Sequence, residues 1–159
     1  MQELPAKTVA ESRTEQVQII MFEQINGFNR LFGGKLMEWI DVVAAVVARR
    51  HSNRNVTTVS IDNLHFKAAA HINSTMVLVG TITHVGHTSM EVRVDAFVEK
   101  LDGSKKMVNR AYITMVALDE NDHPTPVPRL ILTTDEERTE WEAGERRARL
   151  RQQRRIEEF

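Results

Sequence analysis

The 159-residue chain contains no cysteine and no long apolar run. Without cysteine the protein can form no disulfide, no thiolate metal site and no cysteine nucleophile, and this composition fits a reducing compartment. The longest apolar stretch, residues 42–48, is far too short to span a bilayer. The N-terminus shows neither the basic nor the apolar segment of a signal peptide, so we expect a cytoplasmic protein that does not insert into a membrane.

The chain also lacks an excess of positive or of negative charge. The 21 Lys and Arg residues and the 22 Asp and Glu residues leave a net charge of −1, so neither nucleic acid nor an anionic membrane is expected as a partner. The length suits a single domain with a core of its own. We expect a flexible N-terminus over residues 1–13, a folded domain over residues 14–132 and a charged C-terminal helix over residues 133–159. The density of charge in this last helix suggests that it is solvated or faces a partner.

The hydrophobic pattern predicts one buried helix and an antiparallel sheet. Residues 36–50 are apolar at helical spacing and around much of the circumference, as in a helix that is buried in a core. A slip in the alternation near Asn63 indicates a bulge, and Thr134 with Glu137 has the spacing of a capping box that starts the C-terminal helix. Strands are expected over residues 17–22, 56–66, 75–81, 90–99 and 108–118. With a hairpin turn at residues 102–104, this order favours an α+β protein with a curved sheet around the helix.

Several short motifs resemble, in their order along the chain, those of the hotdog acyl-CoA thioester hydrolases. The first group is Asn26, Phe32-Gly33-Gly34, Met37 and Asp41, and the later ones are Val56-Thr57, Phe66 and residues 86–92, 116–119 and 126–130. The resemblance covers the chain from about residue 17 to the charged tail. The chain departs from the family pattern at Asn29, where a glycine is usual, and at residues 67–70 (Lys-Ala-Ala-Ala), where a proline is common.

This resemblance implies a hotdog fold, in which an antiparallel β-sheet wraps around one long central helix, here followed by a charged C-terminal helix. It further implies an enzyme that hydrolyses acyl-CoA to free fatty acid and CoA. CoA would be part of the substrate and of the product, and no cofactor is expected.

Asp41 is the candidate catalytic acid–base group. It lies between apolar neighbours in the predicted buried helix, where a carboxylate is costly to bury unless it has partners. Burial raises the pKa of a carboxyl group and makes it a better base near neutral pH. Position alone favours a structural role, in which the buried carboxylate is hydrogen-bonded to the backbone or to a core histidine. The resemblance implies that Asp41 is a general base or, less commonly, a nucleophile.

The loop before the helix supplies the other catalytic candidates. Gly33 and Gly34 allow close backbone approach at a helix N-terminus with free N–H groups, which would suit an oxyanion hole. From the residues alone, a tight turn explains both glycines and an ordinary Asn-Gly turn explains Asn26. The resemblance implies that Asn26 orients the water or the carbonyl. It also implies that Asn26 and Asp41 of one site come from different subunits of a homodimer, which in this family often assembles into a trimer of dimers.

Candidates for binding CoA lie later in the chain. Thr88, Ser89 and Met90 resemble a CoA-contacting strand entry, and Arg110 and Arg129 could bind phosphates because the arginine fork fits them. A strand start and solvated arginines explain these residues as well. The six histidines form no convergent ligand set in the sequence, so we expect no metal site.

Two further functions stay open. A non-catalytic hotdog module could bind acyl-CoA without turnover. A hotdog dehydratase could act on hydroxyacyl thioesters, although this chemistry usually needs a catalytic histidine and none falls between Asn26 and Asp41. The acyl chain length is not readable from the sequence.

Overall fold

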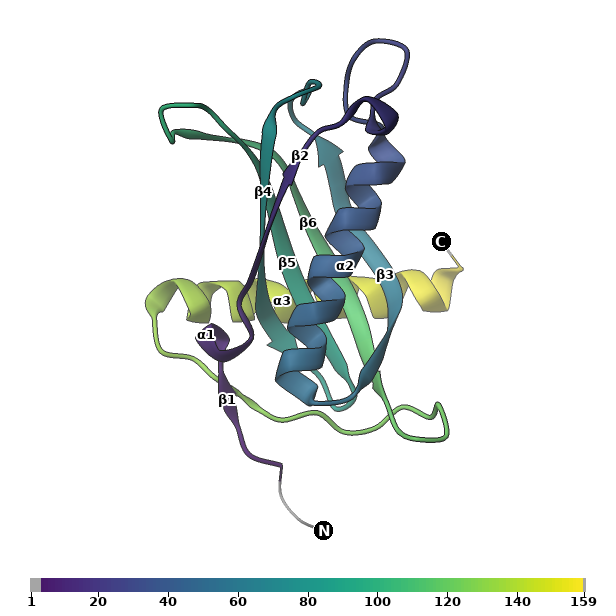
Figure 1. Cartoon of the computed structure of the whole chain (residues 1–159). Coiled ribbons are helices and arrows are strands. Elements are labelled where there is room, and N and C mark those ends of the chain that lie inside the picture. The colour runs from purple at the N-terminus through teal and green to yellow at the C-terminus, as the bar shows by residue number, and fades with distance from the viewer. Residues whose placement is uncertain (1–3, 159) are drawn as a thin grey trace.

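A computed structural model describes residues 4–158, except the side chain of Asn63. Five long strands form one antiparallel sheet in the order β2-β4-β5-β6-β3. The sheet curves around α2, while α3 crosses its other face (Figure 1). The elements are β1 (Lys7–Thr8), α1 (Val9–Ser12), β2 (Thr14–Ile19), the 3-10 helix η1 (Phe22–Gln24), α2 (Gly33–Ser52), β3 (Asn55–Phe66), β4 (Thr75–Val85), β5 (Ser89–Glu99), β6 (Lys105–Leu118), β7 (Leu130–Ile131) and α3 (Asp135–Glu157). The predicted α+β architecture with one central helix is confirmed.

The helix α2 fills the inside of the curved sheet. Ile40, Val43 and Val47 are essentially inaccessible to solvent, as the helical spacing predicted. The helix approaches β4 closely because Gly80 has no side chain: a Cβ there would lie 2.6 Å from Cγ1 of Val43. The helix ends at Asn53, which takes the left-handed conformation that often terminates helices.

The predicted strands are confirmed except for the first, which we placed at residues 17–22. The strand β2 runs over Thr14–Ile19 instead, because an edge strand pairs through its backbone and tolerates the polar residues at its start. The bulge near Asn63 is confirmed by a register shift between Asp62 and His65 where β3 pairs with β6. The predicted turn is confirmed at Gly103, whose φ is +85°.

The N-terminal segment takes part in the fold. We expected residues 1–13 to be flexible. Residues 1–3 of this segment lie outside the described residues, but β1 pairs in parallel with β7, and Val9 and Ser12 of α1 are buried. The folded unit therefore begins no later than Lys7. The rest of the division, a domain up to residue 132 followed by a tail helix, stays a prediction.

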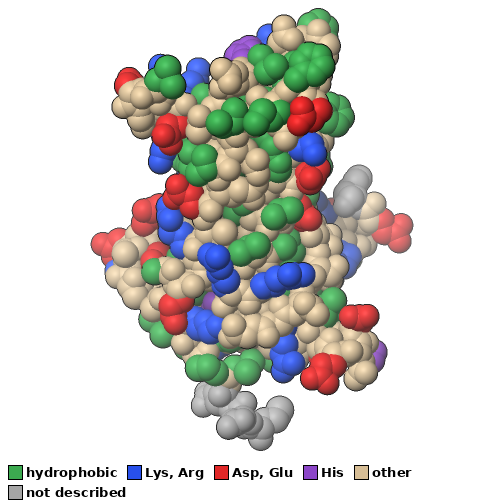
Figure 2. All heavy atoms as spheres, in the orientation of Figure 1, with side chains coloured by type: hydrophobic (Ala, Val, Ile, Leu, Met, Phe, Trp, Pro, Cys, Tyr) green, Lys and Arg blue, Asp and Glu red, His purple; other side chains and the backbone are tan. Residues whose placement is uncertain are grey.

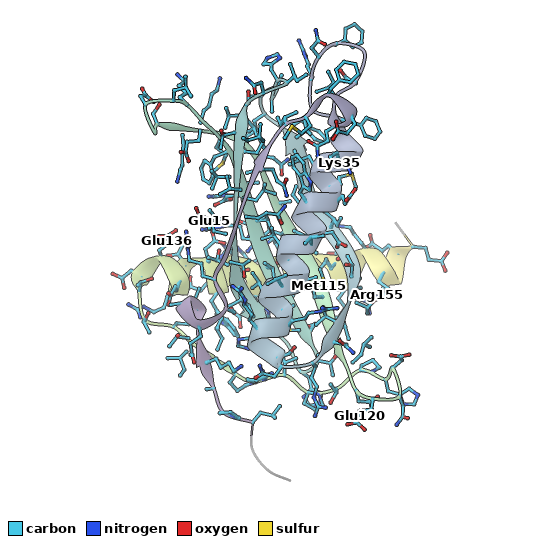
Figure 3. All side chains as sticks on the ribbon, viewed as in Figure 1. Glu15, Lys35, Met115, Glu120, Glu136 and Arg155 are labelled. Atoms are coloured by element: carbon cyan, nitrogen blue, oxygen red, sulfur yellow. The ribbon has the colours of Figure 1, made fainter. Side chains whose placement is uncertain are left out.

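The charge density of α3 led us to expect a solvated tail, but the helix packs on the sheet. It spans the outer face of the sheet, with Glu136 and Arg155 marking its two ends in Figure 3. Half of the predicted capping box is present, since the Thr134 hydroxyl accepts a hydrogen bond from the Glu137 N–H at 3.1 Å. The Glu137 carboxylate does not return to Thr134 but accepts from the Thr133 N–H at 2.6 Å. No helix in the part of the chain that the structure describes has both the length and the apolar character to cross a membrane.

A buried ion network attaches α3 to the sheet. Arg147 donates two hydrogen bonds to Glu91 on β5, at 2.8 and 3.0 Å, and Arg151 bridges Glu91 and Asp62 at 3.1 and 3.0 Å. Burial would raise the pKa of Glu91, but hydrogen bonds from Arg147 and Thr83 outweigh it and hold this pKa below its ordinary value. The arginines of α3 thus neutralise carboxylates that the sheet buries.

Candidate active site

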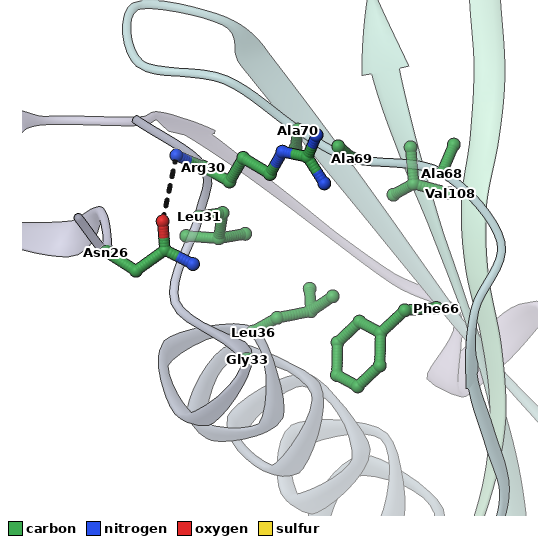
Figure 4. A pocket seen from close by; sticks show the side chains of 10 residues that line it. All are labelled: Asn26, Arg30, Leu31, Gly33, Leu36, Phe66, Ala68, Ala69, Ala70 and Val108. Carbon is green, nitrogen blue, oxygen red and sulfur yellow. Dashed lines mark hydrogen bonds between the residues drawn. The ribbon is translucent and has the colours of Figure 1, made fainter. Parts of the chain in front are cut away.

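Asn26 organises the loop that precedes α2. Its side-chain oxygen accepts hydrogen bonds from the backbone N–H groups of Phe28, at 2.9 Å, and of Arg30, at 3.3 Å, the second of which is drawn in Figure 4. The backbone N–H of Asn26 donates to the Arg30 carbonyl at 2.8 Å. Within residues 4–158 the side-chain NH₂ of Asn26 has no acceptor. The loop therefore occupies the oxygen of this exposed amide and leaves two N–H donors for a ligand.

Gly33 and Gly34 are the first two residues of α2. Their N–H groups precede the first intrahelical bonds, and no described residue accepts a hydrogen bond from them. Neither glycine has a positive φ, so a left-handed turn does not explain them. A Cβ on Gly33 would lie 3.2 Å from the Phe66 ring, so glycine lets that ring lie over the helix start. Two free N–H groups at the positive end of α2 have the chemistry of an oxyanion hole.

A cavity of about 360 Å³ opens beside this helix N-terminus. Of the described residues that line it, only Asn26 and Arg30 have polar side chains, and both lie on the loop before α2. The rest of the lining is apolar and comes from Leu31, Leu36, Phe66, residues 68–70 and Val108. The cavity thus combines hydrogen-bond donors at one side with a surface that suits an alkyl chain.

Asp41 lies on α2 but does not line this cavity. Its Oδ1 accepts a hydrogen bond of 2.6 Å from the Thr58 hydroxyl on β3, and no described residue donates to its Oδ2. We expected Asp41 to be buried in the core. It is half-buried instead, because Ile40 and Ala44 occupy the part of the helix that faces the sheet. A carboxylate held by one hydroxyl, with one oxygen open to solvent, can accept a proton from water.

Asn26 and Asp41 are not adjacent within one chain. Asp41 follows Gly33 by eight residues, which places it about 12 Å further along the helix axis. Asn26 lines the cavity at the helix start, and Asp41 does not. A single chain therefore holds the two predicted catalytic side chains apart.

The predicted CoA-binding residues fall into two groups. Thr88, Ser89 and Arg129 lie together, since Arg129 donates to the Gly86 carbonyl and the turn at residues 86–89 joins β4 to β5. The side chain of Met90 is fully buried in the core, and Arg110 makes a two-bond ion pair with Asp95. The group around Ser89 is at the opposite end of the molecule from the start of α2 (Figure 1).

Thr58 is a candidate site residue that sequence reasoning missed. It follows Thr57 in a strand rich in β-branched residues, so nothing in its neighbourhood distinguishes it from a structural threonine. Only the fold places its hydroxyl next to Asp41. Among residues 4–158 no group of three or more His, Asp or Glu side chains is arranged to hold a metal ion.

Apolar side chains surround these polar groups on the surface. Six large ones on the loop, α2 and β3 are more than a third exposed: Phe28, Phe32, Met37, Val42, Val59 and Phe66. Hydrophobic side chains gather over the loop and the start of α2 in the space-filling view (Figure 2). An exposed apolar surface of this extent commonly marks an interaction site.

The chain is similar to known thioesterases in sequence. The thioesterase superfamily matches residues 28–104. The uncharacterized acyl-CoA thioester hydrolase YkhA of Bacillus subtilis is 38% identical over 128 residues, which cover 80% of this chain and 74% of that protein. The rat cytosolic acyl coenzyme A thioester hydrolase is 29% identical over 88% of this chain, but this covers only 38% of the rat protein.

Solved structures are similar over nearly the whole chain. An acyl-CoA hydrolase from Staphylococcus aureus, in complex with butyryl-CoA, CoA and CoA disulfide, has a TM-score of 0.92 at 29% identity and covers 97% of this chain and 94% of its own. A hexameric acyl-CoA thioesterase has a TM-score of 0.90 at 36% identity, covering 95% of this chain and 97% of its own. The sheet, the central helix and these relatives show that the chain has the hotdog fold and belongs to the thioesterase superfamily.

Proposed function

We propose that the protein hydrolyses acyl-CoA to a free acid and CoA at a site shared between two subunits. Asp41 and Thr58 of one subunit would face Asn26 and the N–H groups of Gly33 and Gly34 of the other. The observation that carries this proposal is the pair of free donor sets, the Asn26 amide and the helix N-terminus, at the mouth of an apolar cavity.

The edge strand β3 suggests how the subunits meet. Within residues 4–158 it pairs only with β6, so in this part of the chain its other edge is open along twelve residues, and a second copy of β3 can extend the sheet by antiparallel pairing. A two-fold axis there would place the start of one α2 beside the far half of the other. The loop carrying Asn26 would then approach Asp41 of the partner subunit. The exposed apolar side chains around both groups would be buried.

In the proposed mechanism, water attacks the thioester carbonyl carbon and gives one proton to Asp41. The carbonyl oxygen becomes an oxyanion, which the N–H groups of Gly33 and Gly34 and the Asn26 amide stabilise. The oxyanion re-forms the carbonyl, the C–S bond breaks, and the CoA thiolate takes the proton back from Asp41. The hydroxyl of Thr58 holds the carboxylate in position. Direct attack by Asp41, through an acyl-enzyme anhydride, is the alternative role for this residue.

Substitutions made in the Staphylococcus aureus enzyme support this set of residues. Solved variants of that enzyme carry alanine in place of an aspartate, a threonine and an asparagine. Those three residues have the same spacing along their chain as Asp41, Thr58 and Asn26 have here. The residue types and intervals favour the same three functional positions in both proteins.

We also propose that the group of Thr88, Ser89 and Arg129 contributes to CoA binding. The two-fold arrangement would bring this end of one subunit alongside the Asn26 loop of its partner. A hexameric relative favours a trimer of such dimers, and the cytosolic relative favours the cytoplasm. Met90 and Arg110 do not belong to this group, because the Met90 side chain is buried in the core and the Arg110 side chain is paired with Asp95.

The assay for the proposed function is the release of free thiol from acyl-CoA by the native protein and by the Asp41→Asn variant. We expect turnover by the native protein and a loss of about 100-fold or more in the variant, since general base catalysis contributes factors of this order. Equal rates in both would remove Asp41 from the mechanism. Tight acyl-CoA binding without turnover would favour a non-catalytic binding module.

A further inference from the structure

We infer that residues 68–70, which we call the alanine wall, set the acyl chain length that the enzyme accepts. The inference rests on the proposed function and specifies the part of the substrate that this function left open. It comes from the shape and lining of the cavity beside α2.

The cavity leads away from the proposed carbonyl site. It starts at Asn26 and Gly33 and extends to Val108 on β6 (Figure 4). Its volume of about 360 Å³ is at the lower end of the range for ligand pockets. At about 30 Å³ for each group of the size of a water molecule or a methylene, this volume holds roughly a dozen such groups. A medium-length alkyl chain would fill this space, and a much longer chain would have to leave it.

The backbone of the alanine wall is fixed at both ends. The N–H of Lys67 donates to the Val108 carbonyl at 2.9 Å, and the Ala70 carbonyl accepts from the Leu31 N–H at 2.8 Å. Ala70 is buried, whereas Ala69 lines the cavity with an exposed side chain. Because the backbone is held in place, the side-chain size at this wall determines how much of the cavity stays open. This segment is also where the sequence departs from the family pattern.

The opposite side of the cavity is formed by Phe66 and Leu36 (Figure 4). Leu36 is buried in the core, but the Phe66 ring is half-exposed over Gly33. An alkyl chain would therefore pass between a large aromatic ring and three methyl groups. Enlarging the alanine side or truncating the aromatic side should move the length limit in opposite directions.

The test measures kcat/KM by thiol release on saturated acyl-CoAs from acetyl to palmitoyl. For the native protein we expect a rise of about fourfold per methylene until the cavity is full, because each buried methylene contributes free energy of this size. Ala69→Leu adds three carbons and should stop the rise about three methylenes earlier, with roughly 50-fold lower kcat/KM on the longest chains that fit the native cavity. In the same variant, hydrolysis of acetyl-CoA should change by less than about twofold, within the scatter of the assay, because the acetyl group is too short to reach the alanine wall.

Two further variants complete the test. Phe66→Ala should extend the rise to longer chains. Ala10→Leu is the matched control, since Ala10 is an exposed alanine on α1, at the opposite end of α2 from the cavity, and should keep the native profile. An unchanged profile in Ala69→Leu, or an equal loss at every chain length, would overturn the inference. Absence of turnover by the native protein on every substrate would instead contradict the proposed function.

Discussion

The ion network beneath α3 gives a quantitative prediction for Glu91→Gln. This substitution removes a charge that is 1% exposed and accepts three hydrogen bonds from Arg147 and Arg151. Breaking a buried ion pair by neutralising one partner costs about 3–5 kcal/mol. We expect a cost at the lower end of this range, because both arginines retain another partner in the variant. Arg151 still pairs with Asp62 at 3.0 Å, and the guanidinium carbon of Arg147 still lies 3.7 Å from the centre of the Tyr112 ring.

We therefore expect Glu91→Gln to lower the free energy of unfolding by about 3 kcal/mol, with a fall in Tm of about 6–12 °C. Urea unfolding followed by circular dichroism, at one fixed protein concentration, measures this change. The control is Glu136→Gln, since Glu136 is 77% exposed and 3.7 Å from Arg93, and it should change stability by less than about 0.5 kcal/mol. A Glu91→Gln variant as stable as this control would refute the account of how α3 is attached.

Three other predictions concern single residues. Gly144→Ala should destabilise the protein by about 1–3 kcal/mol in urea unfolding, although alanine favours helices, because the new Cβ would lie 2.7 Å from Cβ of His84; a gain in stability would contradict this packing. Burial lowers the pKa of His51 below 6.5, so between this lowered pKa and pH 6.5 the unfolded state binds more protons than the folded state. As the pH falls through that window, the free energy of unfolding should fall by up to about 1.4 kcal/mol per pH unit. His51→Gln should flatten this slope between pH 7 and 5 without abolishing it, since burial lowers the pKa of His84 in the same way; an identical slope would remove His51 as a cause. Thr58→Val should lower kcat by roughly 10- to 100-fold, the value of one hydrogen bond to a charged group, with little change in KM; a change confined to KM would argue against positioning of Asp41.

The sequence predicted those parts of the fold that depend on local periodicity. The helical spacing of Leu36, Ile40 and Val43 predicted α2, and the alternation after Met90 predicted β5. The start of β2 was missed because the backbone pairing of an edge strand leaves little trace in its side chains.

The attachment of α3 and the partner of Asp41 depend on contacts between distant segments. Arg151 meets Asp62 across 89 positions of sequence, and one sequence gives no sign of such a pairing. The arginine density of the tail alone therefore suggested a solvated helix. In the same way, the motif around Asp41 pointed to its function, but Thr58 emerged only from the packing of α2 against β3.

Mixing two inactive variants tests the shared active site most directly. Asp41→Asn and Asn26→Ala are purified separately, dissociated, combined in equal amounts and reassociated before thiol release is measured. If each site takes one residue from each subunit, mixed dimers contain one intact site, and activity should return to about a quarter of the native value. If both residues of a site belong to the same chain, no intact site can form, and an inactive mixture with mixed dimers demonstrated by native mass spectrometry would contradict the account.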